Sequence, residues 1–143
     1  MSGVGTRAPR GVVTMIALGG ALGAPARYEV AQAVHVAKDS FPWATFVTNL
    51  SGAFVLGVFL TVLLERAPAA HRLRAFFAVG FLGAFTTFST MAFETVTLTK
   101  DGFALLGIGY LVASIAAGLA VTYLGIASAR AVVGPATAPT GGA

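Results

Sequence analysis

The chain alternates between long apolar stretches without charge and short polar breaks. The four apolar stretches are residues 11–26, 43–64, 75–98 and 102–129. The first continues past Arg27 to about residue 36, and the third is interrupted by Glu94. Each stretch is long enough, as a helix, to cross roughly 30 Å of hydrocarbon. The breaks between them are short, so consecutive helices are expected to be antiparallel neighbours. The pattern predicts an all-α membrane protein with four transmembrane helices.

We expect one four-helix transmembrane domain over residues 11–129, with an N-terminal tail before it. The tail comprises residues 1–10. Residues 130–143 are rich in Gly, Pro, Thr and Ala, and this composition predicts a disordered C-terminal tail.

The first apolar stretch has an alternative interpretation as a signal peptide. Arg7 and Arg10 precede the apolar run, and residues 24–26 offer a small-residue cleavage site. The glycines within the run, among them Gly19 and Gly23, suit close helix packing better than a signal core.

The composition excludes several classes of function. Hydrophobic residues make up 57% of the chain and charged residues 10%, whereas a soluble domain carries about 25% charge. Cysteine is absent, and the two histidines, His35 and His71, have no partner at ligand spacing. No catalytic constellation is apparent, so we do not expect an enzyme, and the net charge of +4 in a membrane protein indicates orientation rather than nucleic-acid binding.

The centre of the third stretch departs from its apolar surroundings. Gly83 is followed by four hydroxyl side chains, those of Thr86, Thr87, Ser89 and Thr90. A glycine and a hydroxyl cluster are a common way for a helix to stop and restart. A break inside a membrane is tolerated only where it is buried or lines a cavity. The pattern therefore predicts a discontinuous helix at an ion or substrate site.

Three further polar residues lie within the apolar stretches. Asn49 offers two N–H donors and one acceptor, for an interhelical hydrogen bond or for a ligand. Arg27 either extends to the membrane interface or supplies a positive field that attracts anions to a vestibule. Glu94 either makes a buried structural hydrogen bond or ion pair, or binds a proton or cation.

Aromatic rings surround the hydroxyl cluster, and a thin polar stripe follows the fourth stretch. Phe85, Phe88 and Phe93 are candidates for simple packing, yet ring edges are electropositive. Edges combined with hydroxyls and an amide would suit a small, hard anion, which needs many donors when it loses water. The stripe recurs at i, i+4 and consists of Tyr110, Ser114, Gly118 and Thr122.

Three motifs in order resemble the fluoride channel family known as Fluc or CrcB, over roughly residues 12–127. The first is GGALGAPARY at residues 19–28, which includes Arg27. The second covers residues 42–57, with Thr45, Asn49, Gly52, Phe54 and Gly57 at the family's positions. The third, GFLGAFTTFST at residues 80–90, resembles the family's signature and is the most specific of the three.

The resemblance implies a channel that passively exports cytoplasmic fluoride and so relieves fluoride toxicity. Family members are four-helix subunits that pair antiparallel, with two pores per dimer and the broken third helices crossing at its centre. The resemblance also implies a structural sodium ion held by backbone carbonyls at Gly83 and Thr86. The pore residues that it implies are Asn49, Phe88, Met91, Ser89, Thr87, Ser114 and Thr122, with Arg27 in the vestibule.

The chain departs from the family pattern at three positions. Met91 stands where a second phenylalanine is common, and a thioether cannot present an electropositive ring edge. Gly118 replaces a hydroxyl in the polar stripe, and Ala44 replaces a glycine of the second motif.

The basic residues are distributed unequally between the two predicted sides. The side with both termini carries Arg7, Arg10, Arg66, Arg72, Arg74 and Arg130, and the other side carries Arg27, Lys38 and Lys100. This bias favours cytoplasmic termini in a bacterial plasma membrane. An antiparallel dimer would then require a second chain whose basic residues are concentrated on the opposite side. Both a homodimer and a heterodimer with a homologous subunit stay open.

Two other classes of function compete with a channel. A small multidrug-type, proton-coupled exporter also has four helices, but it needs a membrane-embedded carboxylate in the first helix, where this chain has only Glu29 near the end. A structural subunit without transport, such as a non-conducting partner in a heterodimer, is the third class, and the broken-helix motif argues against it.

Overall fold

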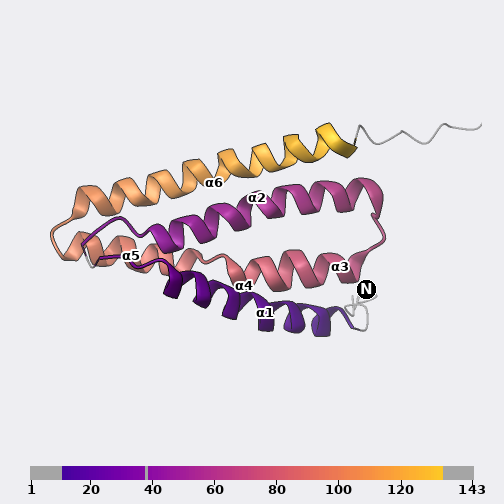
Figure 1. Cartoon of the computed structure of the whole chain (residues 1–143), viewed down its shortest axis with the longest axis horizontal. Helices are drawn as coiled ribbons and strands as arrows, with labels where there is room; N and C mark the ends of the chain where they lie inside the picture. The colour runs from indigo at the N-terminus through magenta and orange to yellow at the C-terminus, as the bar shows by residue number, and fades with distance from the viewer. Residues whose placement is uncertain (1–10, 38, 134–143) are drawn as a thin grey trace, which may run out of the picture.

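The computed structural model describes residues 11–37 and 39–133, and within these ranges every regular element is a helix (Figure 1). The elements in order are α1 (Val12–Ala33), α2 (Trp43–Arg66), α3 (His71–Arg74), the π-helix η1 (Ala75–Leu82), α4 (Gly83–Phe85), α5 (Phe88–Lys100) and α6 (Ala104–Val133). The predicted N-terminal tail, Lys38 and residues 134–143 lie outside the described residues. α6 continues to Val133, four residues beyond the predicted end of the transmembrane domain.

Three helical runs in the described ranges are long and apolar enough to cross a membrane. They are Trp43–Arg66, His71–Lys100 and Ala104–Val133. α1 has 22 residues, but Arg27 and Glu29 lie within it, and it is outside this set. The prediction of an all-helical membrane protein is thus confirmed, while the fourth crossing stays a prediction.

The third run is interrupted near its middle, where the glycine and hydroxyl pattern predicts a break. Thr86 and Thr87 adopt extended conformations, with φ and ψ of −77° and 155°, and of −149° and 113°. The glycine does not end the helix, because Gly83 is helical, with φ of −65° and ψ of −30°. The chain instead leaves the helix at Thr86, and the Thr87 side chain caps α5 by accepting a hydrogen bond from the Thr90 amide at 3.1 Å.

The helices associate as two pairs through glycines. α2 packs along α6, and α1 packs along η1 and α4 (Figure 1). A Cβ atom added at Gly57 would lie 2.5 Å from the Thr122 carbonyl oxygen, and one at Gly125 would lie 2.5 Å from that of Phe54. Such close approach of backbones is how helices associate in lipid, where burial of apolar side chains supplies little driving force.

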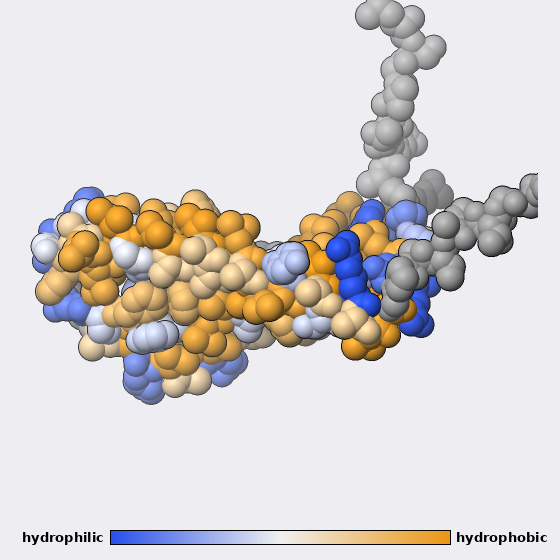
Figure 2. Space-filling view, turned by 90° about the horizontal axis from the view of Figure 1, so that it is seen from above, coloured by the Kyte–Doolittle hydropathy of each residue, from blue (hydrophilic) through white to orange (hydrophobic). Residues whose placement is uncertain are grey.

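Most large apolar side chains face outward. Leu105 is 88% exposed and Leu119 70%, whereas Tyr110 is the largest fully buried side chain among the described residues. Figure 2 shows apolar residues over most of the length of one face, with hydrophilic residues gathered toward the two ends. This distribution is typical of a protein whose surrounding solvent is lipid.

Gly19→Ala is expected to destabilise the protein by about 1–3 kcal/mol, because overpacking forces backbones apart. The added methyl group would meet the backbone carbonyl of Phe76 in η1. At the adjacent Gly20, a Cβ atom would meet only Ala84 Cβ and the Gly80 carbonyl, both at 3.9 Å, so Gly20→Ala is the matched control. Thermal unfolding in one detergent compares the two variants, and equal midpoints would contradict glycine-mediated packing of α1 on η1.

Candidate functional site

Asn49 of α2 satisfies the backbone of the broken helix. Its Nδ2 donates to the Thr87 carbonyl oxygen at 3.0 Å, and the Thr87 amide donates to Asn49 Oδ1 at 2.8 Å. These two bonds replace the helical partners that Thr87 lacks. Of the two roles open to Asn49 from sequence, the structure shows the interhelical hydrogen bond, made to main chain rather than to another side chain.

The hydroxyls after the break form a connected cluster. Thr87 Oγ1 donates to Thr90 Oγ1 at 2.9 Å and lies 3.2 Å from Ser89 Oγ. Thr86 turns away from this cluster, since both its amide and its hydroxyl donate to the Leu82 carbonyl at 2.9 Å. No hydrogen bond from a described residue reaches the carbonyl oxygens of Gly83 or Thr86, which are thus available to a ligand.

A cavity of about 370 Å³ lies on one side of the break, between α2, α5 and α6. Six of the seven predicted pore residues line it, and so do Gly83 and Thr86; Ser89 does not. The six are Asn49, Thr87, Phe88, Met91, Ser114 and Thr122. The structure thereby brings together residues from three parts of the chain that hydropathy alone leaves unconnected.

The polar stripe of α6 contributes Ser114 and Thr122 to the lining of this cavity. Ser114 Oγ is buried and makes no hydrogen bond with any described residue. Thr122 also lines the cavity, but its hydroxyl donates to the Gly118 carbonyl at 2.8 Å. At Gly118 itself, an added Cβ atom would meet nothing within 4 Å, so the stripe has open space there.

The two residues expected to present aromatic edges differ in exposure. Phe88 borders the cavity and is 71% exposed, whereas Met91 borders it and is 5% exposed. Phe85 stacks on Phe81 with ring centroids 6.0 Å apart and does not line the cavity.

A second cavity, of about 320 Å³, lies on the other side of Thr87. Arg27 and Tyr28 of α1 line it, together with Thr45, Thr48 and Thr90. Thr87 borders both cavities, so the Asn49–Thr87 pair forms part of the wall between them. Arg27 is partly buried and is one of the residues that line this second cavity, while its vestibule role stays a prediction.

Glu94 is held by two hydroxyls. Thr45 Oγ1 donates to Glu94 Oε1 at 2.8 Å, and the Tyr110 hydroxyl donates to Oε2 at 2.7 Å. Of the alternatives that the sequence left open, the structure shows the hydrogen-bonded carboxylate. The sequence did not identify Thr45 as its partner, although Tyr110 stood out because it begins the polar stripe.

Asn49→Ala is expected to expose the Thr87 amide to exchange, because both backbone groups would lose their partners at a cost of about 1–3 kcal/mol each. Hydrogen exchange at Thr87, measured in detergent, should accelerate by at least about fivefold, the equivalent of about 1 kcal/mol. Ser51→Ala is the control, since its exposed hydroxyl donates to the Thr48 carbonyl within α2. Unchanged protection in Asn49→Ala would show that the break is held by other contacts.

Comparison with known proteins identifies the family of the chain. The family model described as CrcB-like protein, Camphor Resistance (CrcB), matches residues 14–126. Over 132 residues the chain is 43% identical to "Fluoride-specific ion channel FluC 1" of Streptomyces coelicolor, covering 92% of this chain and 84% of that protein. It is 44% identical over 126 residues to "Fluoride-specific ion channel FluC 2" of Nocardia farcinica, covering 87% and 89%. It is 40% identical over 118 residues to "Fluoride-specific ion channel FluC" of Rhizobium etli (strain CIAT 652), covering 82% and 94%. The chain belongs to the CrcB family.

Proposed function

We propose that this protein is a fluoride-selective ion channel, not an enzyme, and that it passively exports cytoplasmic fluoride and so relieves fluoride toxicity. The observation that carries the proposal is the cavity beside the helix break, where donors meet an aromatic side chain. Relatives at 43% and 44% identity are named fluoride-specific ion channels, which supports the same conclusion.

The chemistry of the cavity suits a small, strongly hydrated anion. A hard anion leaving water needs several donors in exchange. Asn49 lines the cavity, and its Nδ2 has a second N–H besides the one that it donates to the Thr87 carbonyl. Ser114 also lines the cavity and has a buried hydroxyl without a partner among the described residues. Phe88 can add the electropositive edge of its ring. We assign the pore to these three residues together with Thr87, Ser89, Met91 and Thr122, and we assign the vestibule to Arg27.

The working unit that we propose is an antiparallel dimer, either of two identical chains or with a homologous subunit. Phe88 and Phe93 flank the restart of the third helix and are 71% and 72% exposed. Two large aromatic side chains beside a polar break are better covered by protein than by lipid, because the break itself must be buried. A second subunit crossing there would enclose the cavity as a pore.

We also propose a structural sodium ion at the helix break. The carbonyl oxygens of Gly83 and Thr86 fit this role, since no described residue donates a hydrogen bond to them. Hard cations prefer such oxygen ligands. A sodium ion there would neutralise carbonyl dipoles that the two subunits bring together.

When the chain pairs with a homologous subunit, the orientation that we propose places both of its termini in the cytoplasm of a bacterial cell, with the channel in the plasma membrane; two identical chains in an antiparallel dimer would have opposite orientations. The support is the excess of arginine at the end of the bundle where α2 ends and α3 begins. A proton-coupled exporter is not favoured, because Glu29 is exposed and Glu94 is engaged by Thr45 and Tyr110. A non-conducting subunit is not favoured either, because Ser114, whose buried hydroxyl has no hydrogen-bond partner among the described residues, is one of the residues that line the cavity.

Liposomes that contain the purified chain are expected to release fluoride faster than chloride, without a proton gradient. Met91→Phe should raise the fluoride rate, because it adds an electropositive ring edge. Edge contacts in aromatic pairs contribute about 0.5–1.5 kcal/mol, and about 1.4 kcal/mol is tenfold in binding. Phe88→Ile should lower the rate, because it removes the ring but keeps an apolar side chain. Ion-selective electrodes measure both anions.

Equal fluoride and chloride rates would contradict the proposed function, and so would dependence on a proton gradient. Phe103→Ile is the control for Phe88→Ile, because Phe103 is also exposed but does not line the cavity beside the break and is not one of the two rings that we place under the second subunit. If Met91→Phe leaves a fast single-chain channel unchanged, the position does not contact the ion. If the chain alone releases no fluoride, and fluoride is released when a homologous subunit is added, the result would favour the heterodimer.

Replacement of sodium by choline at constant ionic strength is expected to loosen the dimer and slow fluoride release, because the carbonyl dipoles at the break would repel one another. Chemical cross-linking in detergent and efflux from liposomes report the two effects. Potassium at the same concentration serves as a second control for ionic strength. Identical dimer content and efflux in sodium and choline would rule out a structural ion at Gly83 and Thr86.

A further inference from the structure

Five basic side chains gather at one end of the bundle, which we call the basic end. They are Arg66, His71, Arg72, Arg74 and Arg130. α2 and α6 finish there and α3 begins there, as the ion pair between Arg130 and Glu65 and the bond from Arg66 to Val133 show. The start of α1 is also close, because the Arg72 guanidinium lies beside Gly11. Figure 2 shows hydrophilic residues at this end.

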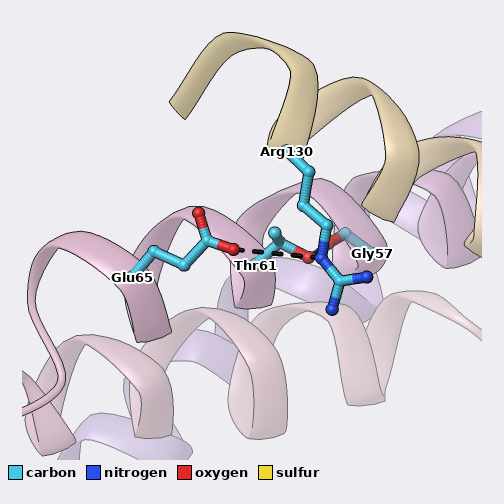
Figure 3. A network of polar contacts seen from close by, with 4 residues as sticks. All are labelled: Gly57, Thr61, Glu65 and Arg130. Atoms are coloured by element: carbon cyan, nitrogen blue, oxygen red, sulfur yellow. Dashed lines mark hydrogen bonds and ion pairs between the residues drawn. The ribbon is translucent and has the colours of Figure 1, made fainter. Parts of the chain in front are cut away.

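The basic end has more basic side chains than carboxylates among the described residues that could neutralise them. Glu65 is the one carboxylate there among the described residues, and its Oε1 lies 3.9 Å from Arg130 Nε (Figure 3). This pair leaves the Arg130 side chain 69% exposed. Arg66 Nη2 donates to the Val133 carbonyl at 3.2 Å. Arg72 and Arg74 are exposed and make no ion pair or side-chain hydrogen bond with any described residue.

The opposite end of the bundle has a different balance. Arg27 and Lys100 are its described basic residues apart from His35, and Glu29, Asp39 and Asp101 are its carboxylates. Arg27 is also partly buried against a cavity. Positive charge is therefore concentrated at the basic end and is not a general property of the helix ends.

Exposed apolar side chains occur close in sequence to the arginines of the basic end. Leu64 precedes Arg66 and is 52% exposed, and Leu73 lies between Arg72 and Arg74 and is 44% exposed. Val132, near the end of α6, is 85% exposed. Exposed leucine and valine need acyl chains around them, so the arginines beside them lie where a bilayer places its phosphate groups.

We propose that the basic end binds anionic phospholipids, with Arg72 and Arg74 as the main phosphate ligands. Guanidinium groups bind phosphate through two parallel N–H···O bonds, which makes arginine better suited to this role than a point charge. The occupant is a lipid and not free phosphate, because the apolar side chains beside the arginines would contact the acyl chains. The proposal depends on insertion in a membrane and not on which ion the protein conducts.

Thermal unfolding of the full chain in neutral detergent tests the proposal. Added dioleoyl phosphatidylglycerol is expected to raise the unfolding midpoint, while dioleoyl phosphatidylcholine and inorganic phosphate at equal concentration are not. In Arg72→Gln and in Arg74→Gln, the phosphatidylglycerol concentration for half the effect should rise roughly fivefold for the one charge removed. Lys100→Gln is the matched control, since it removes one exposed charge from the opposite end.

The outcomes divide cleanly. A phosphatidylglycerol effect that shrinks with added salt, and that either arginine variant weakens more than Lys100→Gln does, supports the proposal. Equal effects of the two lipids would show that acyl chains alone stabilise the protein. An equal effect of inorganic phosphate would indicate a site for the free ion. Equal sensitivity of Lys100→Gln and the arginine variants would show non-specific attraction. Each of these last three results would overturn it. Native mass spectrometry of the unmutated chain should show retained phosphatidylglycerol, whether or not the variants fold.

Discussion

The paired hydrogen bonds between Asn49 and Thr87 are central to this molecule. In hydrocarbon an unpaired backbone amide or carbonyl has no water to hydrogen-bond. A helix can therefore be interrupted only where other protein groups supply the missing hydrogen bonds. An asparagine side chain carries one donor group and one acceptor in a planar amide, as a peptide bond does, and it satisfies both groups of Thr87 at 3.0 and 2.8 Å. The extended segment can therefore persist in a membrane and separate two cavities.

Packing around the break follows from small residues. Glycines bring α1 onto η1 and α2 onto α6 at distances that any side chain would prevent. Gly52 brings α2 against the third helix, because an added Cβ atom there would meet the Thr86 side chain. In this register Asn49 bonds to Thr87 and Thr45 bonds to Glu94. The subunit nevertheless leaves Phe88 uncovered beside the cavity, which is understandable if the pore is completed by a second chain.

Polar groups within the apolar part of the bundle differ from those at its basic end in how completely they are paired. Within it, Glu94 and the cluster around Thr87 are paired, and the Ser114 hydroxyl is the conspicuous exception among the described residues. At the basic end the arginines stay exposed, and Arg72 and Arg74 make no ion pair or side-chain hydrogen bond with a described residue. The reason is the solvent: an unpaired polar group is costly at membrane depth, whereas a guanidinium at the surface finds water or lipid phosphate. An unpaired polar group at membrane depth therefore indicates a ligand. Unpaired positive charge at the end of the bundle indicates contact with the membrane surface.

Local signals in the chain were enough to predict the helices, the interrupted third helix and the family, because apolar length and a glycine followed by hydroxyls act within a few residues of one another. They did not reveal the π-helix Ala75–Leu82, nor that Gly83 stays helical while Thr86 leaves the helix. The hydrogen bonds between Asn49 and Thr87 and between Thr45 and Glu94 could not be predicted from the sequence either. Those bonds join residues 38 and 49 positions apart. They form only when two helices pack in one register, and that register depends on the summed contacts of many glycines and side chains rather than on any single segment.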